Sequence, residues 1–428
     1  MAKCNRYRCV RVSIMLRELS AVKDMVIHIM NNSKMQFSLS EKLRNSIALQ
    51  LILIIGLAFT WNNQNSNGLC TDWPVGRGNA SSTATADSTL PAKPQILWQY
   101  KTGSEKSGFE GTPVISDGKV FVGDFDGTIH AIDLFTGKAV WTTKKKDGFV
   151  TAAAASQGCI VIGDFSGMIY GLDAKTGMDL WYCDIEQQIA SGANFFGDSV
   201  LVTSDGGTMF AMDLKTGHPK WNYATGDQLR SSPTIWKTFS LLGGCDGRLH
   251  KIDLIKGEST GEGVQLQAPT LSTPSVIGKI AIVATQPGVV LAIDVETEKV
   301  VWTFTEPSQS SDIRSSPAAL GKFENDQITG IAVVATRNRR ILGLDLQNGK
   351  MLWESVLKKK SDGSPVICDG RAWVSSTDGM VYALDLKAGL ETWSFQLPGQ
   401  ILASPAIAED RLVIATEKGS VVCFGKQE

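Results

Sequence analysis

The chain has 428 residues, of which 43% are hydrophobic and 20% are charged, and its formal net charge at pH 7 is -1. This composition fits a globular protein with a large core, and the lack of a basic surface tract argues against nucleic acid as a partner. The eight cysteines form no CxxC or CxxCH spacing, which excludes a haem-c attachment site and a zinc ribbon.

The first 70 residues have the features of a leader with an export signal. Residues 1–45 carry nine Lys or Arg against three Asp or Glu. Lys42 and Arg44 precede an apolar run over residues 47–61, and a polar stretch follows over residues 62–68. This order is typical of a signal for export. The run is shorter than the ~20 residues of a spanning helix, so we expect cleavage; an uncleaved anchor and a cytosolic hydrophobic stretch are the alternatives.

The end of this leader lies near Cys70. A lipid-modified cysteine commonly follows such a signal, but Leu69 is bulkier than the residue expected before it, so cleavage just after Cys70 is favoured over lipidation. Translation from Met30 or Met35 is a further alternative. Residues 71–94 are expected to form a lead-in and a linker, because their second half is rich in Ser, Thr and Ala.

From residue 95 onward the sequence repeats with a period near 40 residues. Residues 127–141, GTIHAIDLFTGKAVW, recur with their Asp, Gly and Trp in place. The repeated acid occurs at Asp133, Asp173, Asp213, Asp253, Asp294, Asp345 and Asp385. A Trp follows eight residues later, except in the fourth repeat, where Gly261 replaces it. These residues are Trp141, Trp181, Trp221, Trp302, Trp353 and Trp393, and Trp98 stands in the same setting before the first repeat.

Each repeat resolves into four short strands. In the first repeat they are expected at residues 112–116, 120–124, 128–134 and 139–143. Pairs such as Asp117-Gly118 and Thr136-Gly137 lie between them and supply the positive φ that tight hairpins require. Each repeat is therefore a four-stranded antiparallel meander. Such sheets have two faces to bury, so the copies must stack face to face around an axis.

The two ends of the repeat region complete each other. The last unit, residues 404–425, has only three strands, whereas residues 96–101 form a strand with no repeat of its own. Placing residues 96–101 beside residues 419–424 supplies the missing strand and removes both sheet edges. We therefore predict an all-β fold over residues 95–428: an eight-bladed β-propeller of four-stranded antiparallel blades, the last closed by the N-terminal strand.

The motif A-I-D-x-x-T-G-K-x-x-W at residues 131–141 resembles the repeat of pyrroloquinoline-quinone-type (PQQ-like) eight-bladed propellers. Related copies at residues 171–181 and 383–393 extend the resemblance, which covers residues 95–425. Two branches share this repeat: quinoprotein dehydrogenases, and non-catalytic propellers similar to the lipoprotein subunit of the outer-membrane β-barrel assembly machinery. The repeat indicates the fold and does not choose the branch. Residues 73–78, WPVGRG, also resemble the W-P-x-W-R-G lead-in of secreted relatives, with Gly76 replacing the second Trp.

The repeated Asp and Trp are expected to be structural. The Asp carboxylate can accept backbone N–H bonds in the following turn, and the Trp ring can pack between neighbouring sheets. Gly261 predicts a looser seam in the fourth blade, either a docking notch or, as we favour, a decayed repeat. The sixth blade has an insertion at residues 321–330, whose acidic residues lack the spacing of calcium ligands.

The residue pattern favours a protein without catalytic activity. Quinoprotein dehydrogenases commonly have a vicinal Cys-Cys pair and long insertions that build the cofactor pocket, and this chain has neither. His130 and His250 occupy equivalent repeat positions, which favours a packing or surface role over a metal pair. We therefore expect no enzyme activity, no cofactor and no metal.

Surface recognition is the function that remains. Arg230 and Arg314 each stand directly before Ser-Ser-Pro, at the mouth of the channel between the inner strands. We expect them to contact a carboxylate or an extended peptide of a partner; solvated rim charges are the alternative. The outer strand of a blade, with its unpaired backbone, offers a second route for peptide binding.

The sequence thus predicts an exported, periplasmic or envelope-associated scaffold that binds other envelope proteins. The resemblance implies a role in outer-membrane protein assembly. We expect a monomer within a complex, with membrane contact only peripheral or through an uncleaved anchor. A PQQ-dependent dehydrogenase and the sensor domain of a signalling system are the alternatives.

Overall fold

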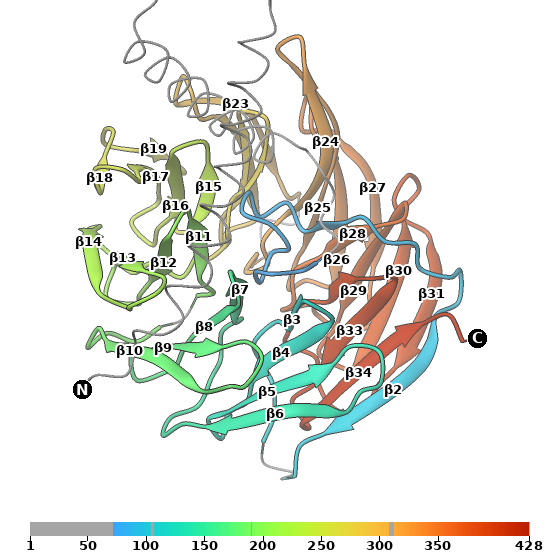
Figure 1. The fold of residues 1–428 in the computed structure, drawn as a ribbon. Coiled ribbons are helices and arrows are strands. Elements are labelled where there is room, and N and C mark those ends of the chain that lie inside the picture. Colours follow the sequence, from blue (N-terminus) through green and yellow to red (C-terminus); the bar gives the residue numbers. More distant parts are fainter. Residues whose placement is uncertain (1–71, 104–106, 190, 308–311, 428) are drawn as a thin grey trace, which may run out of the picture. The chain divides into compact units, whose positions relative to one another are not determined.

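A computed structural model of the chain describes residues 72–103, 107–189, 191–307 and 312–427. Within these residues, eight sheets of antiparallel strands are arranged as the blades of a propeller, as predicted (Figure 1). The expected leader, with its apolar run at residues 47–61 and Cys70, lies outside the described residues. In the described part of the chain, no helix is long and apolar enough to cross a membrane.

Blade 1 shows how one repeat folds. From the axis outward its strands are β3 (Val114–Ser116), β4 (Lys119–Gly123), β5 (Thr128–Asp133) and β6 (Ala139–Lys144). Asp117 and Gly118, with φ of 55° and 68°, form the first tight turn. Asp133 Oδ1 accepts the backbone N–H groups of Phe135 and Thr136 at 3.1 and 2.8 Å, which holds the turn before β6.

The other blades follow the same order of strands. Blade 2 is β7 (Ala154–Ser156), β8 (Cys159–Gly163), β9 (Met168–Asp173) and β10 (Asp179–Asp184); blade 3 is β11 (Asn194–Phe196), β12 (Ser199–Thr203), β13 (Thr208–Asp213) and β14 (Pro219–Ala224). Blade 4 is β15 (Thr234–Trp236), β16 (Phe239–Gly243) and β17 (Arg248–Asp253), with β18 (Glu258–Ser259) and β19 (Val264–Gln265) both paired to β17. Blade 5 is β20 (Ser275–Ile277), β21 (Ile280–Ala284), β22 (Val289–Asp294) and β23 (Lys299–Thr305).

Blades 6 to 8 complete the circle. Blade 6 is β24 (Ala318–Glu324), β25 (Gln327–Ala335), β26 (Arg340–Asp345) and β27 (Met351–Val356). Blade 7 is β28 (Val366–Cys368), β29 (Arg371–Ser375), β30 (Met380–Asp385) and β31 (Glu391–Gln396), to which β1 (Thr85–Ala86) adds in parallel. Blade 8 is β32 (Ala406–Ala408), β33 (Arg411–Ala415), β34 (Ser420–Gly425) and β2 (Gln95–Lys101).

The predicted closure is confirmed by the pairing of β2 with β34. The two strands are antiparallel, with Trp98 opposite Cys423 and Lys101 opposite Ser420. Strand β2 is therefore the outermost strand of the last blade, and the innermost strand β3 of blade 1 contacts β32 on one side and β7 on the other. The ends of the repeat region lie side by side in Figure 1, where β2 runs along β34.

Tryptophans join most neighbouring blades. The ring of Trp98 lies against Gly137 of blade 1, where an added Cβ atom would come within 2.6 Å of Trp98 Cγ. Its indole Nε1–H donates to the carbonyl oxygen of Leu134 at 2.8 Å. The same ring-on-glycine contact recurs in the pairs Trp141 with Gly177, Trp181 with Gly217, Trp221 with Gly257, Trp302 with Gly349, and Trp353 with Gly389. Each such glycine has positive φ, so the turn presents its bare backbone to the ring.

The seam between blades 4 and 5, where Gly261 replaces Trp, is filled by other side chains. Glu298, with φ of 56°, stands where the other turns have the glycine. Lys251 Nζ donates to the carbonyl oxygen of Val295 at 2.9 Å, the carbonyl that corresponds to Leu134 of blade 1, and lies 3.3 Å from Glu298 Oε1. A lysine thus makes the hydrogen bond that tryptophan makes at other seams, which argues against an open notch.

The insertion in blade 6 lengthens its first hairpin. Strands β24 and β25 pair over residues 318–333, and Asn325 and Asp326, both with positive φ, form a two-residue turn. Figure 1 shows this hairpin projecting beyond the other blades. Asp326 Oδ1 lies 3.4 Å from Lys279 Nζ of blade 5, so its carboxylate has a cationic partner.

Residues 72–90, which we call the strap, run along the inner strands and hydrogen bond to all eight blades. The contact begins with reciprocal backbone bonds between Trp73 and Ile115 in blade 1 and ends with the Thr89 N–H on Asp410 Oδ1 in blade 8. Between them, the strap bonds to Ala155, Asn194, Ile235, Val276, Ala319 and Ile367. From its composition, the second half of this stretch was predicted to be a linker. In the structure, the strap instead packs against the inner strands, at the ends that lie away from the small residues with which the blades begin.

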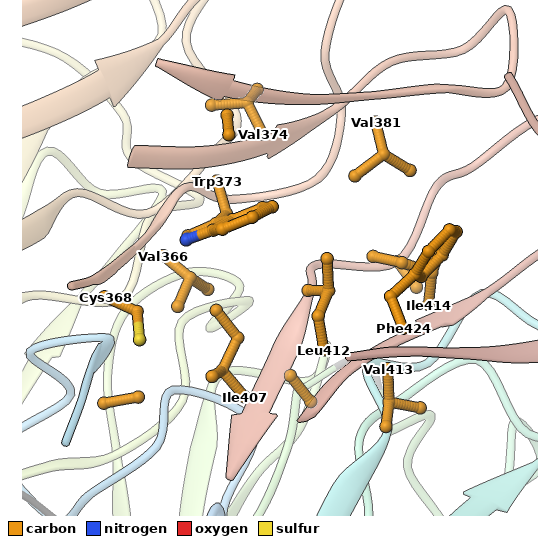
Figure 2. Packing of buried hydrophobic residues seen from close by; sticks show 14 of the residues in the cluster. Val366, Cys368, Trp373, Val374, Val381, Ile407, Leu412, Val413, Ile414 and Phe424 are labelled. Atoms are coloured by element: carbon orange, nitrogen blue, oxygen red, sulfur yellow. The ribbon is translucent and has the colours of Figure 1, made fainter. Parts of the chain in front are cut away.

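Buried apolar side chains fill the space between neighbouring blades. Figure 2 shows part of the largest cluster, between blades 7 and 8, where Trp373 lies near Val366 and Phe424 lies near Ile414. Trp373 and Phe424 have no exposed surface. Because the inner strands of each blade are buried on both faces, their side chains hold the axis rigidly and position the residues around it.

Candidate functional site

The main candidate site is a funnel at the end of the axis away from the strap, with a volume of about 630 Å³. All eight blades contribute to its wall or to the loops that lead into it. The lining residues, which define the axial funnel, are Glu110, Val150, Phe165, Gln188, Asp205, Arg230, Leu271, Arg314, Arg337, Asp362 and Leu402. Most stand directly before the small residues that begin an inner strand, so one position of the repeat is displayed in many copies around one opening.

The structure brings Arg230 and Arg314, predicted from the sequence, into this one wall. Arg230 forms a two-pronged ion pair with Asp205 of blade 3: Nε to Oδ1 and Nη2 to Oδ2 are both 3.1 Å. Arg314 Nε donates to Asp312 Oδ2 at 2.9 Å. About half of the Arg314 side chain is exposed, and 43% of that of Arg230. Both guanidinium groups are therefore oriented by carboxylates but still accessible to a partner.

Arg337 adds a third cation on the same wall. Its Nη1 lies 3.2 Å from Asp312 Oδ2, and its Nε lies 2.9 Å from Asp362 Oδ1. Lys360 Nζ approaches the other oxygen of Asp362 at 3.0 Å. The two arginines of blade 6 are thus linked through Asp312 to Asp362, the acidic residue of blade 7, whereas Arg230 of blade 4 is paired separately with Asp205.

The remaining lining residues of the funnel are mainly acidic and apolar. Burial raises the pKa of Glu110, and the nearby carboxylate of Asp362 raises it further. Phe165, at the hairpin between β8 and β9, is 52% exposed. Val150, Leu271 and Leu402 complete an apolar surface between the charges. The funnel therefore offers fixed cations, carboxylates and an exposed aromatic ring, a combination that suits a polypeptide segment rather than one small apolar ligand.

Below the funnel, two residues further along the inner strands, hydroxyl groups join the blades. Each accepts a hydrogen bond from a backbone N–H of a neighbouring blade, at 2.8 to 3.2 Å. The members of this hydroxyl belt are Thr112, Ser232, Thr273, Ser316, Ser364 and Ser404. The belt is interrupted at Ala152 and Gly192, and there the strap lies close, since a Cβ atom on Gly76 would come within 2.7 Å of the Ala152 Cβ.

The two equivalent histidines lie in separate blades. His130 Nε2 lies 2.8 Å from Asp124 Oδ2, and this carboxylate oxygen also accepts a hydrogen bond from the Ser107 hydroxyl. On the other side of the ring, the hydroxyl oxygen of Tyr100 on β2 lies 3.0 Å from His130 Nδ1. His250 Nε2 lies 2.8 Å from Asp246 Oδ2. The carboxylate stands between serine and imidazole, so this is not the order of groups that activates a serine nucleophile.

The funnel does not fit the quinone and calcium ion of the dehydrogenase branch. Calcium requires several oxygen ligands that are available to it. Asp205 and Asp362 are instead paired with Arg230 and Arg337. Among the residues that the structure describes, no group of three His, Cys, Asp or Glu could hold a metal ion. The wall carries three arginines where a quinoprotein would need carboxylate and amide ligands around calcium.

Several wall residues were missed in the sequence. Asp362 stands directly before Gly363, the same position relative to a blade start as Arg230, so the repeat could have revealed it. Phe165, Asp205 and Arg337 come from a different loop, between the second and third strands. The type of residue at that position differs from blade to blade, so the sequence shows no repeated pattern there. These residues come together at one opening only when the blades are arranged around the axis.

Comparison with known families gives a match over most of the chain. The family model described as outer membrane protein assembly factor BamB matches residues 88–182, 165–366 and 337–427. Among curated proteins, no sequence matches this chain.

Solved structures share the fold. BamB from Moraxella catarrhalis is 20% identical with a TM-score of 0.64, covering 78% of this chain and 98% of its own. The quinohemoprotein alcohol dehydrogenase from Comamonas testosteroni is 14% identical with a TM-score of 0.67, covering 85% of this chain and 82% of its own. The computationally designed Ika8 protein is 16% identical with a TM-score of 0.65, covering 78% of this chain and 100% of its own. At these identities the likeness concerns architecture alone.

Proposed function

Because the chain belongs to the PQQ-like propeller family described as outer membrane protein assembly factor BamB, we propose that it is a non-catalytic, protein-binding scaffold of the bacterial cell envelope that acts in outer-membrane protein assembly. The observation that carries this proposal is the wall of the axial funnel. Arg230 and Arg314 are held by carboxylates yet stay accessible beside the exposed ring of Phe165. The partner is then an envelope protein that inserts a segment with a carboxylate and an apolar side chain.

This geometry favours peptide recognition for a physical reason. A guanidinium that is already oriented by a carboxylate loses little side-chain entropy when it binds a second acceptor. An exposed aromatic side chain beside it gains apolar contact when a partner covers it, as at the centres of protein interfaces. The proposal includes export to the periplasm or envelope and action as a monomer within a complex.

The experiment is affinity capture from cell envelopes with two matched double variants. Phe165→Ala with Arg314→Ala removes one exposed ring and one exposed cation from the funnel. Tyr182→Ala with Lys237→Ala removes the same two types of group elsewhere, since Tyr182 is 70% exposed on β10 and the Lys237 side chain is 58% exposed. We expect outer-membrane assembly proteins to co-purify with the wild type and the control, and to be lost with the funnel variant.

Two results would overturn the proposal. Equal capture by both variants would remove the funnel from the interaction. Turnover of an alcohol or sugar after addition of the quinone, calcium and an artificial electron acceptor would favour the dehydrogenase branch instead. The structural likeness to a quinohemoprotein alcohol dehydrogenase makes this second assay necessary.

A further inference from the structure

Every charged residue that lines the axial funnel, except Glu110, has a partner of opposite charge. Arg230 is paired with Asp205, and the two arginines of blade 6 are paired with Asp312 and Asp362. Glu110 lines the same opening and is exposed, but in the part of the chain that the structure describes its carboxylate forms no ion pair and no hydrogen bond. The funnel therefore displays one carboxylate that is available to a cation.

The backbone on both sides of Glu110 is firmly held. Phe109, directly before it, has no exposed surface, and its N–H donates to the carbonyl oxygen of Thr416 at 3.1 Å. Gly111, directly after it, passes blade 2 so closely that an added Cβ atom would lie 2.2 Å from the carbonyl oxygen of Thr151. The Glu110 side chain therefore extends from a fixed point of the wall, so that a ligand does not have to order this loop when it binds.

The ionised Glu110 side chain does not stabilise the fold. Partial burial and the carboxylate of Asp362 both raise its pKa, and no cation opposes them. A carboxyl group with a higher pKa in the folded than in the unfolded state lowers the stability of the fold at a pH where it is ionised. A carboxylate in such a setting, in a cleft, is typical of a functional site.

Apolar and aromatic side chains from blades 1 and 2 lie at the same opening. Val150 and Phe165 line the funnel, and Phe165 is 52% exposed. Phe125 occupies the equivalent hairpin of blade 1 and is 37% exposed, and its N–H donates to the carbonyl oxygen of Gly108 at 3.0 Å. An aromatic ring attracts a cation to its face, and the long stems of lysine and arginine cover apolar surface. These neighbours therefore suit a cationic side chain.

The ion-pair network of blades 6 and 7 has one positive charge in excess. Its two carboxylates, those of Asp312 and Asp362, are shared by three cationic side chains. These are Arg314, Arg337 and Lys360. The funnel thus combines an excess cation on these blades with an unpaired carboxylate at Glu110. A segment that carries one carboxylate and one cation complements both charges.

We propose that the partner segment places a lysine or arginine side chain against Glu110, Val150 and Phe165, which we call the cation subsite. This inference rests on the proposed function, in which Arg314 binds a carboxylate of the same segment, and it adds the second charge that the segment carries. The cationic head pairs with the Glu110 carboxylate, and its stem covers the two apolar side chains. A metal ion does not suit the subsite, because calcium and magnesium require several oxygen ligands and Glu110 is its only acid.

Selection from a library of random dodecapeptides displayed on phage tests the subsite directly. The baits are the full chain and two variants, Glu110→Gln and Glu409→Gln. Glutamine keeps the size of the side chain and removes its charge, and Glu409 is an exposed acid in the turn between β32 and β33, outside the funnel. Wild type and Glu409→Gln should select peptides enriched in Lys or Arg as well as in Asp or Glu. Glu110→Gln should lose only the enrichment in Lys or Arg.

A double-mutant cycle then measures the pairing. The most enriched peptide is synthesised with blocked ends, together with a version in which its basic residue is replaced by glutamine. This replacement should weaken binding to the wild type by about three- to tenfold, and to Glu110→Gln by less than about twofold. The unfolding temperature of Glu110→Gln should equal or exceed that of the wild type at pH 7, so a loss of binding does not reflect unfolding.

The outcomes separate this inference from the proposed function. If the wild type selects acidic and apolar residues without basic ones, or if Glu110→Gln selects basic residues equally well, the cation subsite is overturned and the proposed function stands. If the wild type enriches neither charge, both are overturned.

Discussion

Trp98 Nε1 donates a 2.8 Å hydrogen bond to the carbonyl oxygen of Leu134, 36 positions further along the chain. Trp98 lies on the strand that closes blade 8, and Leu134 begins a turn of blade 1. The ring also covers Gly137, so one side chain joins the end of the circle to its beginning. Each of the other seams with a Trp and Gly pair has the same contact between ring and glycine. Only the Trp98 seam joins the closing strand to the first blade.

Replacing Trp98 by alanine should therefore destabilise the propeller by about 3 to 5 kcal/mol, because the change leaves a cavity between blades 8 and 1 and an unpaired carbonyl oxygen. Denaturant unfolding monitored by circular dichroism measures the loss. Tyr182→Ala, on an outer strand and 70% exposed, should change stability by less than about 0.5 kcal/mol. A Trp98→Ala protein as stable as the Tyr182→Ala protein would show that the closure does not depend on this ring.

The seam between blades 4 and 5 leads to a second prediction. Lys251 has a side chain that is only 15% exposed and makes the bond to Val295 that an indole makes elsewhere. Lys251→Met keeps the length of the side chain but loses this bond and the contact with Glu298, so unfolding free energy should fall by about 1 to 2 kcal/mol. Lys220→Met, at an ion pair with exposed Asp198, serves as the control in the same denaturation assay. Equal losses would mean that Lys251 does not replace the missing tryptophan.

The eight-bladed architecture could be predicted from the sequence because every repeat contains the residues that fix its own turns. Asp133 and its equivalents hold turns within a few residues, and Asp117-Gly118 adopts the positive φ that its hairpin requires. The replacement of Trp by Gly261 could be read from the sequence. The contacts that fill the seam could not be predicted, because Lys251 and Glu298 come from different repeats. Long-range substitutions of this kind leave no periodic signal.

The packing of the strap against the blades could not be predicted for a different reason. Most of its contacts with the blades are backbone hydrogen bonds, which do not depend on residue type, so its Ser, Thr and Ala resembled those of a flexible segment. Arg230 and Arg314 could be predicted because they share one repeat position. The hydrogen bonds from the Arg77 guanidinium to the carbonyl oxygens of Ser316, Pro317 and Pro365 could not be predicted, since nothing in its sequence neighbourhood indicates that the chain turns back across the inner strands.

The strap makes a close contact that can be tested by a double-mutant cycle. Gly76 passes so near the belt gap that a Cβ atom would lie 2.7 Å from the Ala152 Cβ. Gly76→Ala should therefore cost about 1 to 3 kcal/mol through overpacking. Ala152→Gly removes the opposing atom, so the double variant should be less destabilised than the two single losses predict, with a coupling of at least about 1 kcal/mol. Additive losses would show that the strap does not pass Ala152 in solution.

Acid should weaken the contact between the closing strand and blade 1 through Asp124. Burial of this carboxylate acts to raise its pKa, but hydrogen bonds from His130, Ser107 and the Thr128 N–H prevail, and the pKa is lowered from its ordinary value of 3.8. The folded state therefore binds this proton less tightly than the unfolded state. The stabilisation is complete above the ordinary pKa and is lost as the pH falls through the lower, folded value. The measurement is the free energy of unfolding of wild type and Asp124→Asn between pH 7 and pH 2.

At pH 7, Asp124→Asn should be about 1 to 3 kcal/mol less stable than the wild type, since the charged acceptor of a buried network is lost. That difference should shrink below pH 4, as the wild-type carboxylate takes up its proton. Asp126→Asn, in the same hairpin but exposed, should follow the wild type within about 0.5 kcal/mol throughout. Because His130 links Asp124 to Tyr100 of β2, the acid-sensitive step should also expose the β2 edge, which hydrogen exchange at Gln99 and Lys101 would report. A difference between wild type and Asp124→Asn that stays constant with pH would contradict the lowered pKa.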